Sequence, residues 1–247
     1  FDQIGRQNKK NRHILSWWGR VKQAVNLVVA IDGPAASGKG TLARRLADIL
    51  TLRYLDTGSL YRATGLTVLN TGGDPTIESD AVKASESLDL SYFSAEDLRS
   101  EEAGVAASHV AFIPSVRAVL LDFQRSVAAN PGAAFKGAIL DGRDIGTVVC
   151  PGADSKIFVE ATLEVRIKRR LQELMERGEP VIEARIRADM TARDKRDRDR
   201  SVAPLKPADD AWVLDTSNMN ADEALAVALG HIRGTGPFKI VSLDDTC

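Results

Sequence analysis

The chain has 247 residues, of which 44% are apolar and 27% are charged, and its net charge is −1. This is ordinary globular composition, and the length suits one large domain or a core with a small insert. A near-neutral chain has no basic field along its whole length, which argues against nucleic acid or a membrane surface as partner. Two cysteines cannot form a disulfide framework, which favours a reducing compartment such as the cytoplasm. No apolar run approaches the roughly 18 residues of a membrane span.

Residues 1–26 differ in composition from the rest of the chain. They contain a single acidic side chain, Asp2, and six basic ones: Arg6, Lys9, Lys10, Arg12, Arg20 and Lys22. An acid-poor basic leader is typical of an organelle targeting segment, of a remnant of a longer chain, or of a poorly ordered extension. We predict a disordered extension here, a folded domain over 27–234 and a tail over 235–247.

From residue 27 onward, strand-like apolar runs alternate with helical patterns. The predicted strands are 27–31, 54–55, 138–140, 156–159 and 212–214. Apolar residues at helical spacing follow three of these strands, over 42–50, 163–174 and 224–232. This alternation predicts an α/β fold in three layers, with a parallel five-stranded sheet covered on both faces. Ligands bind such sheets at the carboxyl ends of the strands.

Residues from about 72 to 130 break this alternation. The turn signal Gly72-Gly73-Asp74-Pro75 is followed by helical stretches and one strand-like run over 88–93. We interpret this part as an insert that covers one side of the ligand site. The core of the domain is then 27–71 together with 131–234.

A glycine-rich segment directly after the first strand carries the strongest motif. It contains Gly33, Pro34, Ala35, Ala36, Ser37, Gly38, Lys39, Gly40 and Thr41, and it opens a helix. Glycines let successive N–H groups point at one anion, the helix N-terminus favours negative charge, and Lys39 can reach the β- and γ-phosphates of a nucleotide. Gly40 separates the lysine from Thr41, which weakens the prediction that Thr41 contacts Mg²⁺. The alternative is a glycine-rich turn with an incidental lysine.

Two further loops follow predicted strands. The first contains Asp56 and Arg62, and the second is Asp141-Gly142-Arg143-Asp144. A carboxylate at the end of an apolar strand, as at Asp141, suits Mg²⁺ bound through water. The guanidinium groups of Arg62 and Arg143 match phosphate oxygens. Each loop alone would also fit a simple Asp-Gly turn, but three such loops at successive strand ends together predict a phosphate site.

The segment 193–200 alternates arginine and aspartate almost without interruption. On a helix, Arg193 and Asp197 have the i,i+4 spacing of an ion pair, whereas Arg196 and Arg200 form a like-charge pair. Such a run is often a solvated helix. Its surplus of arginine on one face also suits a lid over a polyphosphate, which we place at about 178–205.

In this order, the motifs resemble the bacterial-type cytidylate kinase family from residue 28 to about 233. The most diagnostic parts are DTGSLYR at 56–62, ILDGRDIGTVV at 139–149, and 193–205 with its ending VAPL. The resemblance implies a P-loop fold with an insert for the nucleoside monophosphate (NMP) and a small helical lid. It also implies transfer of the γ-phosphate of ATP to CMP, and to dCMP, by a monomer that uses Mg²⁺.

The resemblance also implies individual roles. The glycine-rich segment would hold ATP, Arg62 and Arg143 would clamp the acceptor phosphate, and Arg193 and Asp197 would reach the ribose. Arg196, with the other lid arginines, would reach the transferring phosphoryl group. The residues implied to surround the cytosine are Thr57, Ser108, Arg117, Asp144 and Arg200. From its own pattern, 107–117 predicts only an amphipathic helix.

The chain departs from the family at 94–98, where the family has a longer β-hairpin in its insert. We therefore expect a truncated small sheet in the insert. Charge neutralisation by Lys39, Mg²⁺, Arg143 and the lid arginines would carry the reaction, because the acceptor oxygen is already ionised and needs no general base. The alternatives are another small-molecule kinase of this fold and a nucleotide-binding switch. A guanine-specific switch would carry Asn-Lys-x-Asp, and the chain has only Asn8-Lys9, without the aspartate.

Overall fold

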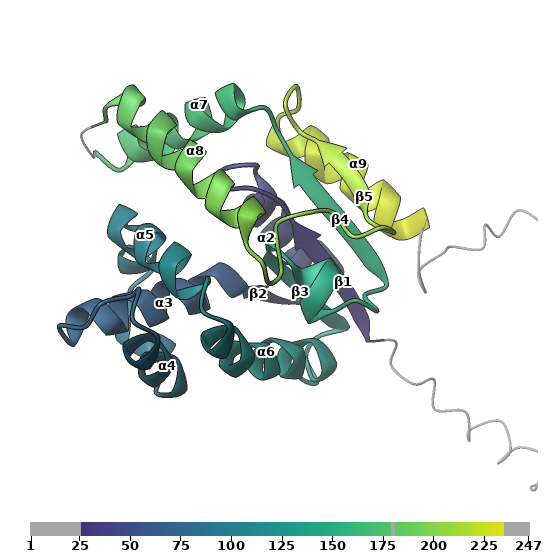
Figure 1. Ribbon diagram of the computed structural model, residues 1–247. Helices are drawn as coiled ribbons and strands as arrows, with labels where there is room; N and C mark the ends of the chain where they lie inside the picture. The colour runs from purple at the N-terminus through teal and green to yellow at the C-terminus, as the bar shows by residue number, and fades with distance from the viewer. Residues whose placement is uncertain (1–25, 179–180, 235–247) are drawn as a thin grey trace, which may run out of the picture.

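The structure is a computed structural model that describes residues 26–178 and 181–234 (Figure 1). The predicted extension at the N-terminus and the tail 235–247 therefore lie outside the described residues, except for Asn26. The side-chain amide of Asn26 donates a hydrogen bond to the carbonyl of Ala128. The chain thus enters the fold beside the end of a helix.

The centre of the molecule is a parallel sheet whose order is β2-β3-β1-β4-β5. The strands are β1 (Leu27–Asp32), β2 (Arg53–Asp56), β3 (Gly137–Gly142), β4 (Ser155–Glu160) and β5 (Trp212–Asp215). All five predicted strands and their parallel arrangement are confirmed. The register pairs Asp56 with Asp141 and Asp32 with Gly142, so the acidic strand ends meet at one edge.

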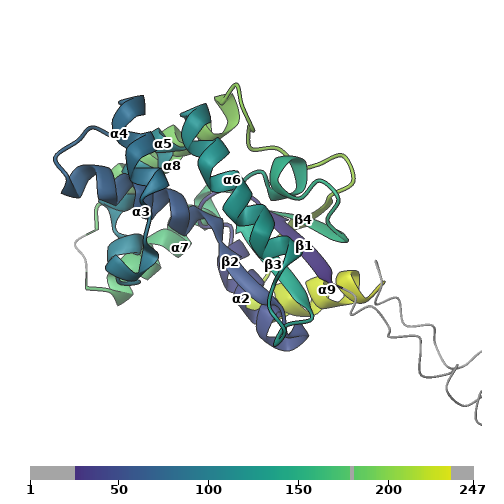
Figure 2. The ribbon, with the colours of Figure 1, turned by 90° about the horizontal axis from the view of Figure 1, so that it is seen from below.

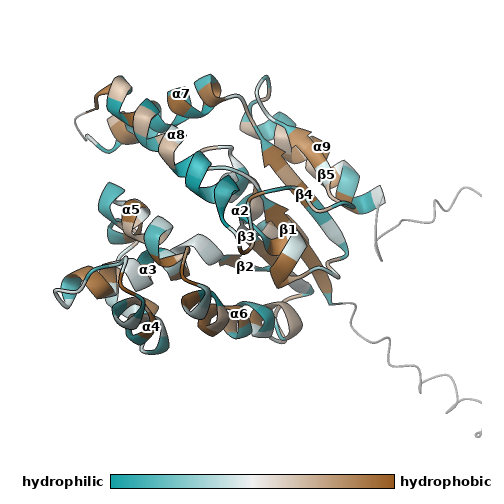
Figure 3. Cartoon of the chain, in the orientation of Figure 1, coloured by the Kyte–Doolittle hydropathy of each residue, from teal (hydrophilic) through white to brown (hydrophobic). Residues whose placement is uncertain are grey.

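Helices cover both faces of the sheet, which gives the predicted three layers (Figures 1 and 2). Helices α2 (Lys39–Leu50) and α9 (Ala221–Gly234) cover one face, and α6 (Pro114–Ala129) with the π-helical turn η3 (Ile145–Val149) covers the other. Strand side chains alternate between the faces. Val29 and Ile31 of β1 therefore face the first pair, and Ala30 faces the second. Much of β1 and β4 is accordingly coloured as hydrophobic in Figure 3.

The insert forms a helical unit beside the sheet. Its helices are α3 (Thr57–Asn70), α4 (Glu78–Glu86) and α5 (Glu101–Val110), which pack together with the start of α6. Leu60, Tyr61 and Val68 of α3 belong to this apolar cluster. The helical unit therefore begins within α3, whereas the insert was predicted to begin at about residue 72.

The predicted strand at 88–93 is wrong. This segment contains the 3-10 turn η1 (Leu90–Tyr92), and a second 3-10 turn, η2 (Asp97–Arg99), follows. The Asp89 side chain accepts a hydrogen bond from the Ser91 N–H, which offers the backbone a local turn in place of a strand. All strands that the structure describes belong to the central sheet. A truncated small sheet was expected in the insert, and within the described residues the insert has no sheet at all.

The predicted continuous helix over 107–117 is also wrong. Helix α5 ends at Val110, α6 begins at Pro114, and the two helices are bent by 104°. Proline lacks the N–H that a continuing helix needs, and it holds the preceding Ile113 in an extended conformation. No single helix in the described part of the chain is long and apolar enough to cross a membrane, although α5 and α6 meet that test jointly as a bent pair.

The lid prediction falls on α8 (Glu183–Asp199), which packs against α7 (Leu163–Glu176). In Figure 3, α8 is coloured mostly as hydrophilic where it passes over the carboxyl ends of the strands. Its described buried residues are Met190, Asp194 and Asp197. The helix therefore lies on the molecule mainly through polar side chains.

Candidate active site

A cavity of about 470 Å³ lies at the carboxyl ends of β2 and β3, between the insert helices and α8. The predicted site residues that line it are Ala35, Ala36, Lys39, Gly40, Thr57, Arg62, Ser108, Arg117, Asp141, Arg143, Asp144, Arg193, Arg196, Asp197 and Arg200. Those that do not line it are Gly33, Pro34, Ser37, Gly38 and Thr41. The fold thus gathers residues from segments more than 100 positions apart around one space.

The glycine-rich loop curls tightly against the sheet. Gly33 has φ 150° and Gly38 has φ 91°, and a Cβ on Gly33 would lie 2.0 Å from the carbonyl oxygen of Val159 in β4. Only glycine fits that approach. Ala36 also takes a left-handed conformation, with φ 58°. Successive residues of opposite hand turn backbone N–H groups to one side and form an anion-binding concavity.

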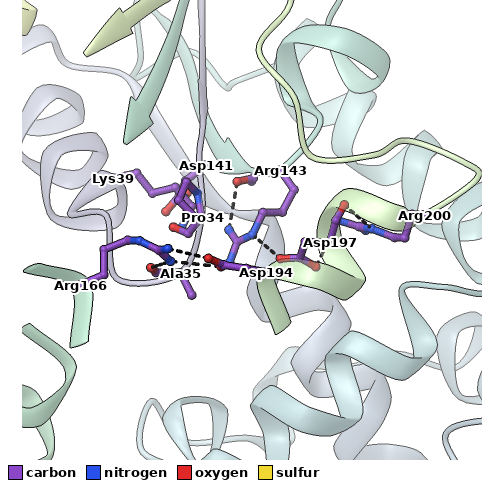
Figure 4. Close-up of polar contacts among 10 residues, drawn as sticks. Pro34, Ala35, Lys39, Asp141, Arg143, Arg166, Asp194, Asp197 and Arg200 are labelled. Carbon is purple, nitrogen blue, oxygen red and sulfur yellow. Dashed lines mark hydrogen bonds and ion pairs between the residues drawn. The ribbon is translucent and has the colours of Figure 1, made fainter. Parts of the chain in front are cut away.

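Lys39 and Asp141 face each other at the floor of the cavity (Figure 4). The Lys39 ammonium is 3.8 Å from Asp141 Oδ1 and 3.4 Å from the Pro34 carbonyl oxygen. Burial, with the positive charge of Arg143, lowers the pKa of Lys39 to about 8. Burial also raises the pKa of Asp141 above its ordinary value, against the attraction of Lys39. Both groups would gain from a phosphate and a cation placed between them.

The donor set near Asp141 fits a magnesium ion. Asp141 Oδ1 is buried and has no hydrogen-bond partner in the described residues, while Tyr54 donates to Oδ2 at 3.3 Å. Mg²⁺ commonly takes one or two carboxylates together with waters and substrate phosphates. The side chain of Thr41 is exposed and outside the cavity, whereas a Cβ on Gly40 would lie 3.0 Å from Asp141 Oδ2. The structure therefore brings position 40, not Thr41, to the carboxylate.

The two arginines predicted to clamp the acceptor phosphate are paired with carboxylates. Arg62 donates to Asp56 at 2.6 Å. Arg143 donates to Asp197 on α8 at 3.0 Å and to the carbonyl of Gly142 at 3.1 Å (Figure 4). Each guanidinium keeps further N–H groups that a phosphate can use.

The residues predicted to surround a base lie together at the insert side of the cavity. Arg117 and Asp144 form a buried ion pair there, and burial raises the pKa of Asp144. The Thr57 hydroxyl donates to the Asp141 carbonyl at 2.8 Å, and the Ser108 hydroxyl donates to the Val105 carbonyl at 2.8 Å. Both hydroxyl protons are engaged, so these oxygens face a ligand as acceptors.

The ion pair predicted between Arg193 and Asp197 is not formed between these two described side chains. Asp197 instead accepts from Arg143 and, at 3.3 Å, from Arg200. The Nε atoms of Arg193 and Arg196 are buried without a hydrogen-bond partner among the described residues. Burial, with the charge of Arg143, lowers the pKa of Arg193 to about 10. These two cations are available to an anionic ligand.

Several cavity residues were absent from the sequence prediction. Arg44 and Arg170 also line the cavity. Arg44 follows Gly40 by four positions and shares its helix face, which is a readable signal. Arg170 has no such signal, because only the crossing of α7 and α8 brings it there. Asp32, which does not line the cavity, was missed too: its buried carboxylate accepts the N–H groups of Ile145 and Gly146, each at 2.8 Å.

Comparison with known proteins agrees with this geometry. The family model described as cytidylate kinase matches residues 29–233. The chain belongs to the cytidylate kinase family. The cytidylate kinase of Paramagnetospirillum magneticum is 56% identical over 84% of this chain and 98% of its own length. That of Granulibacter bethesdensis is 54% identical over 86% of this chain and 100% of its own.

A third relative, the cytidylate kinase of Rhodospirillum rubrum, is 55% identical over 82% of this chain and 95% of its own length. Among solved structures, the shikimate kinase of Bacteroides thetaiotaomicron is a distant match. It is 8% identical and has a TM-score of 0.46, over 84% of this chain and 98% of that one. Family membership rests on the sequence relatives, because this chain matches each of them over nearly its whole length.

Proposed function

We propose that this chain transfers the γ-phosphate of ATP to CMP, which gives CDP and ADP. The observation that carries the proposal is one cavity with the P-loop and Lys39 at one side and the Arg117–Asp144 pair at the other. Ten cationic side chains line this cavity against seven carboxylates, which suits two polyanionic substrates. Family membership supports the same reaction.

At the donor side, the P-loop backbone and Lys39 would hold the ATP phosphates. Asp141 would hold Mg²⁺ through water, and the ion would neutralise charge on the phosphates. Asp141 Oδ1 has the Lys39 ammonium at 3.8 Å but no hydrogen-bond partner among the described residues, which supports this role. Lys39 would then leave Asp141 for the transferring phosphate, where a cation stabilises charge that develops in the transition state.

At the acceptor side, the CMP phosphate would replace carboxylates as the partner of two arginines. Arg62 now donates to Asp56 and Arg143 donates to Asp197. Arg143 lies in the loop that follows β3 and contacts Asp197 of the lid helix α8, so it can position the attacking oxygen in line with the γ-phosphate. The attacking oxygen is already ionised, and no general base is required.

The base would lie against the Arg117–Asp144 pair. Cytosine presents an amino donor and a ring-nitrogen acceptor, and uracil reverses both. Asp144 as a carboxylate can only accept, and Arg117 can only donate, so the pair matches cytosine. Thr57 and Ser108 line the same part of the cavity with acceptor oxygens. Uracil there would leave a buried charge unpaired.

The lid would complete the site. Arg193 and Arg196 reach the cavity from α8 with Nε atoms that have no described partner. A seated lid excludes water, which limits hydrolysis of ATP and strengthens the charge interactions inside. The proposal also includes dCMP as an acceptor, a ribose contact by Arg193 and Asp197, a monomeric state and a cytoplasmic location.

The test is a coupled assay of ADP release with CMP, dCMP, UMP, AMP and shikimate as acceptors. We expect CMP to give the highest kcat/KM and dCMP to follow it. Faster turnover of AMP or shikimate would assign the chain to another acceptor. Release of ADP at a rate independent of every acceptor would indicate a nucleotide-binding switch instead.

A further inference from the structure

Arg166 of α7 and Asp194 of α8 form a buried ion pair behind the cavity, which neither residue lines (Figure 4). The guanidinium reaches both carboxylate oxygens, with Nη1 to Oδ1 at 3.0 Å and Nη2 to Oδ2 at 2.5 Å. The side chains are only 4% and 8% exposed. This two-pronged geometry fixes orientation as well as distance. The pair therefore fixes the lid helix on the core.

The same guanidinium also holds the P-loop. Its Nη1 donates to the carbonyl of Ala35 at 3.2 Å, and its Nε donates to the carbonyl of Ala161 at 3.1 Å. Ala35 lies in the phosphate-binding loop, and Ala161 directly follows β4. One side chain thus connects the P-loop, the sheet and the lid helix.

The contact with Ala35 bears on how the P-loop presents its N–H groups. In a trans peptide the carbonyl and the following N–H point in opposite directions. Arg166 lies outside the cavity and draws the Ala35 carbonyl toward itself, so the N–H of Ala36 turns to the opposite side. Ala36 is left-handed at φ 58°, a conformation that a residue with a Cβ keeps only where its surroundings hold it. Arg166 contributes to that hold from the Ala35 side, while Arg169 and Thr216 donate to the Ser37 carbonyl on the other side.

The way in which α8 packs on the core gives the Arg166–Asp194 pair a second consequence. Two of the three buried residues of this helix are carboxylates, Asp194 and Asp197, and the third is Met190. Asp194 contacts Arg166, which in turn holds the P-loop, and Asp197 binds Arg143 in the loop after β3. Buried ion pairs contribute little net stability, but they fix a geometry. The lid helix is thus fixed to the donor side through one carboxylate and to the acceptor side through the other.

We propose that Arg166 is a positioning residue for phosphoryl transfer, which couples the seat of the lid helix to the phosphate-binding shape of the P-loop. The proposal rests on the proposed function, since it concerns the same reaction. A coupling of this kind is reciprocal: a seated lid tightens ATP binding, and bound ATP favours the seated lid.

The decisive variant removes the pair without leaving a buried charge. In the double variant Arg166→Met/Asp194→Leu, apolar side chains of similar length replace both partners, a change that is often neutral or stabilising. It also removes the donor to Ala35. Arg166→Lys is the companion variant, because lysine keeps the positive charge and loses the two-pronged contact of the guanidinium with Asp194.

Arg187→Gln is the matched control. Arg187 also joins α8 to α7, through an ion pair with Glu164, but that pair is exposed and does not touch the P-loop. Binding of a non-hydrolysable ATP analogue and of CMP is measured separately with Mg²⁺ by calorimetry, and kcat with ATP and CMP is measured beside them. Hydrogen exchange of 185–199 with and without the analogue reports the lid.

We expect the double variant to raise the Kd of the ATP analogue about tenfold and to lower kcat about 10²-fold, the scale of a slight misplacement of reacting groups. The Kd of CMP stays within twofold, and the analogue no longer protects 185–199. Arg166→Lys gives smaller losses of the same kind, and Arg187→Gln behaves as wild type.

A folded double variant with wild-type affinity for the analogue and wild-type turnover would overturn the proposal. Equal losses for the analogue and CMP would overturn it as well, because they indicate a general loss of packing. A wild-type chain that binds the analogue but transfers no phosphate to CMP would refute the proposed function. In that case the comparison of affinities and hydrogen exchange would still decide whether Arg166 couples the lid to the P-loop.

Discussion

Replacement of Asp144 by asparagine tests the proposed recognition of the base separately from the other tasks of the cavity. The Asp144 side chain is buried and paired with Arg117. Asparagine keeps its shape, loses its charge and offers donors as well as an acceptor. A site that loses a required polar partner discriminates less, by up to about 10⁴-fold in the strongest cases. We expect kcat/KM for CMP to fall about 10²- to 10³-fold and that for UMP to change far less.

The same substitution affects stability, and its size follows from the surroundings of Arg117. Loss of one partner from a buried ion pair costs about 3–5 kcal/mol. The asparagine oxygen can still accept one hydrogen bond from Arg117, which offsets about 1 kcal/mol. The net cost is then about 2–4 kcal/mol, which lowers Tm by about 4–16 °C in a domain of this size.

The assay compares CMP and UMP at saturating ATP, well below the Tm of the variant, with calorimetric melting of the same samples. Asp122→Asn is the control, because Asp122 is an exposed carboxylate on the same helix as Arg117 and does not line the cavity. An equal loss of kcat/KM for both acceptors would refute the reasoning. Asp144 would then only hold the loop that carries Arg143, and base selection would lie elsewhere.

Three further predictions use single variants. Lys39→Met should lower turnover about 10²-fold. In the wild type, kcat/KM for ATP should decline above pH 8, because burial lowers the Lys39 pKa to about 8 and the neutral amine no longer attracts phosphate. Burial raises the pKa of Asp32 to about 7 from 3.8, so the native state binds more protons between these values and stability falls as pH rises through that window. Asp32→Asn should flatten the dependence of Tm on pH there. Arg196→Ala should abolish most turnover while Tm stays within about 2 °C, because partly exposed charges contribute little to stability; an active Arg196→Ala enzyme would contradict the lid role.

Local patterns in the sequence determined the core fold of this protein. The five strands, the helices after them and the P-loop follow from short apolar runs, helical spacing and glycines at close approaches, all of which act within about ten residues along the chain. The parallel sheet then follows from the alternation of strands and helices. The break before Pro114 could have been predicted too, since proline cannot continue a helix. It was missed because the apolar spacing on both sides of the break suits one helix.

The tertiary structure alone decided the long-range ion pairs of the buried carboxylates Asp194 and Asp197. Asp197 has Arg193 and Arg200 at helical spacing; it pairs with Arg200 and with Arg143, which lies 54 positions away in the chain, and not with Arg193. Arg166 meets Asp194 across 28 positions and Ala35 across 131. Helical spacing offers Asp197 two arginines of the charged run, Arg193 and Arg200, and solvent screens exposed local pairs of this kind to nearly equal energies. Only burial, where α7, α8 and the strand ends meet, makes one partner far better than the others.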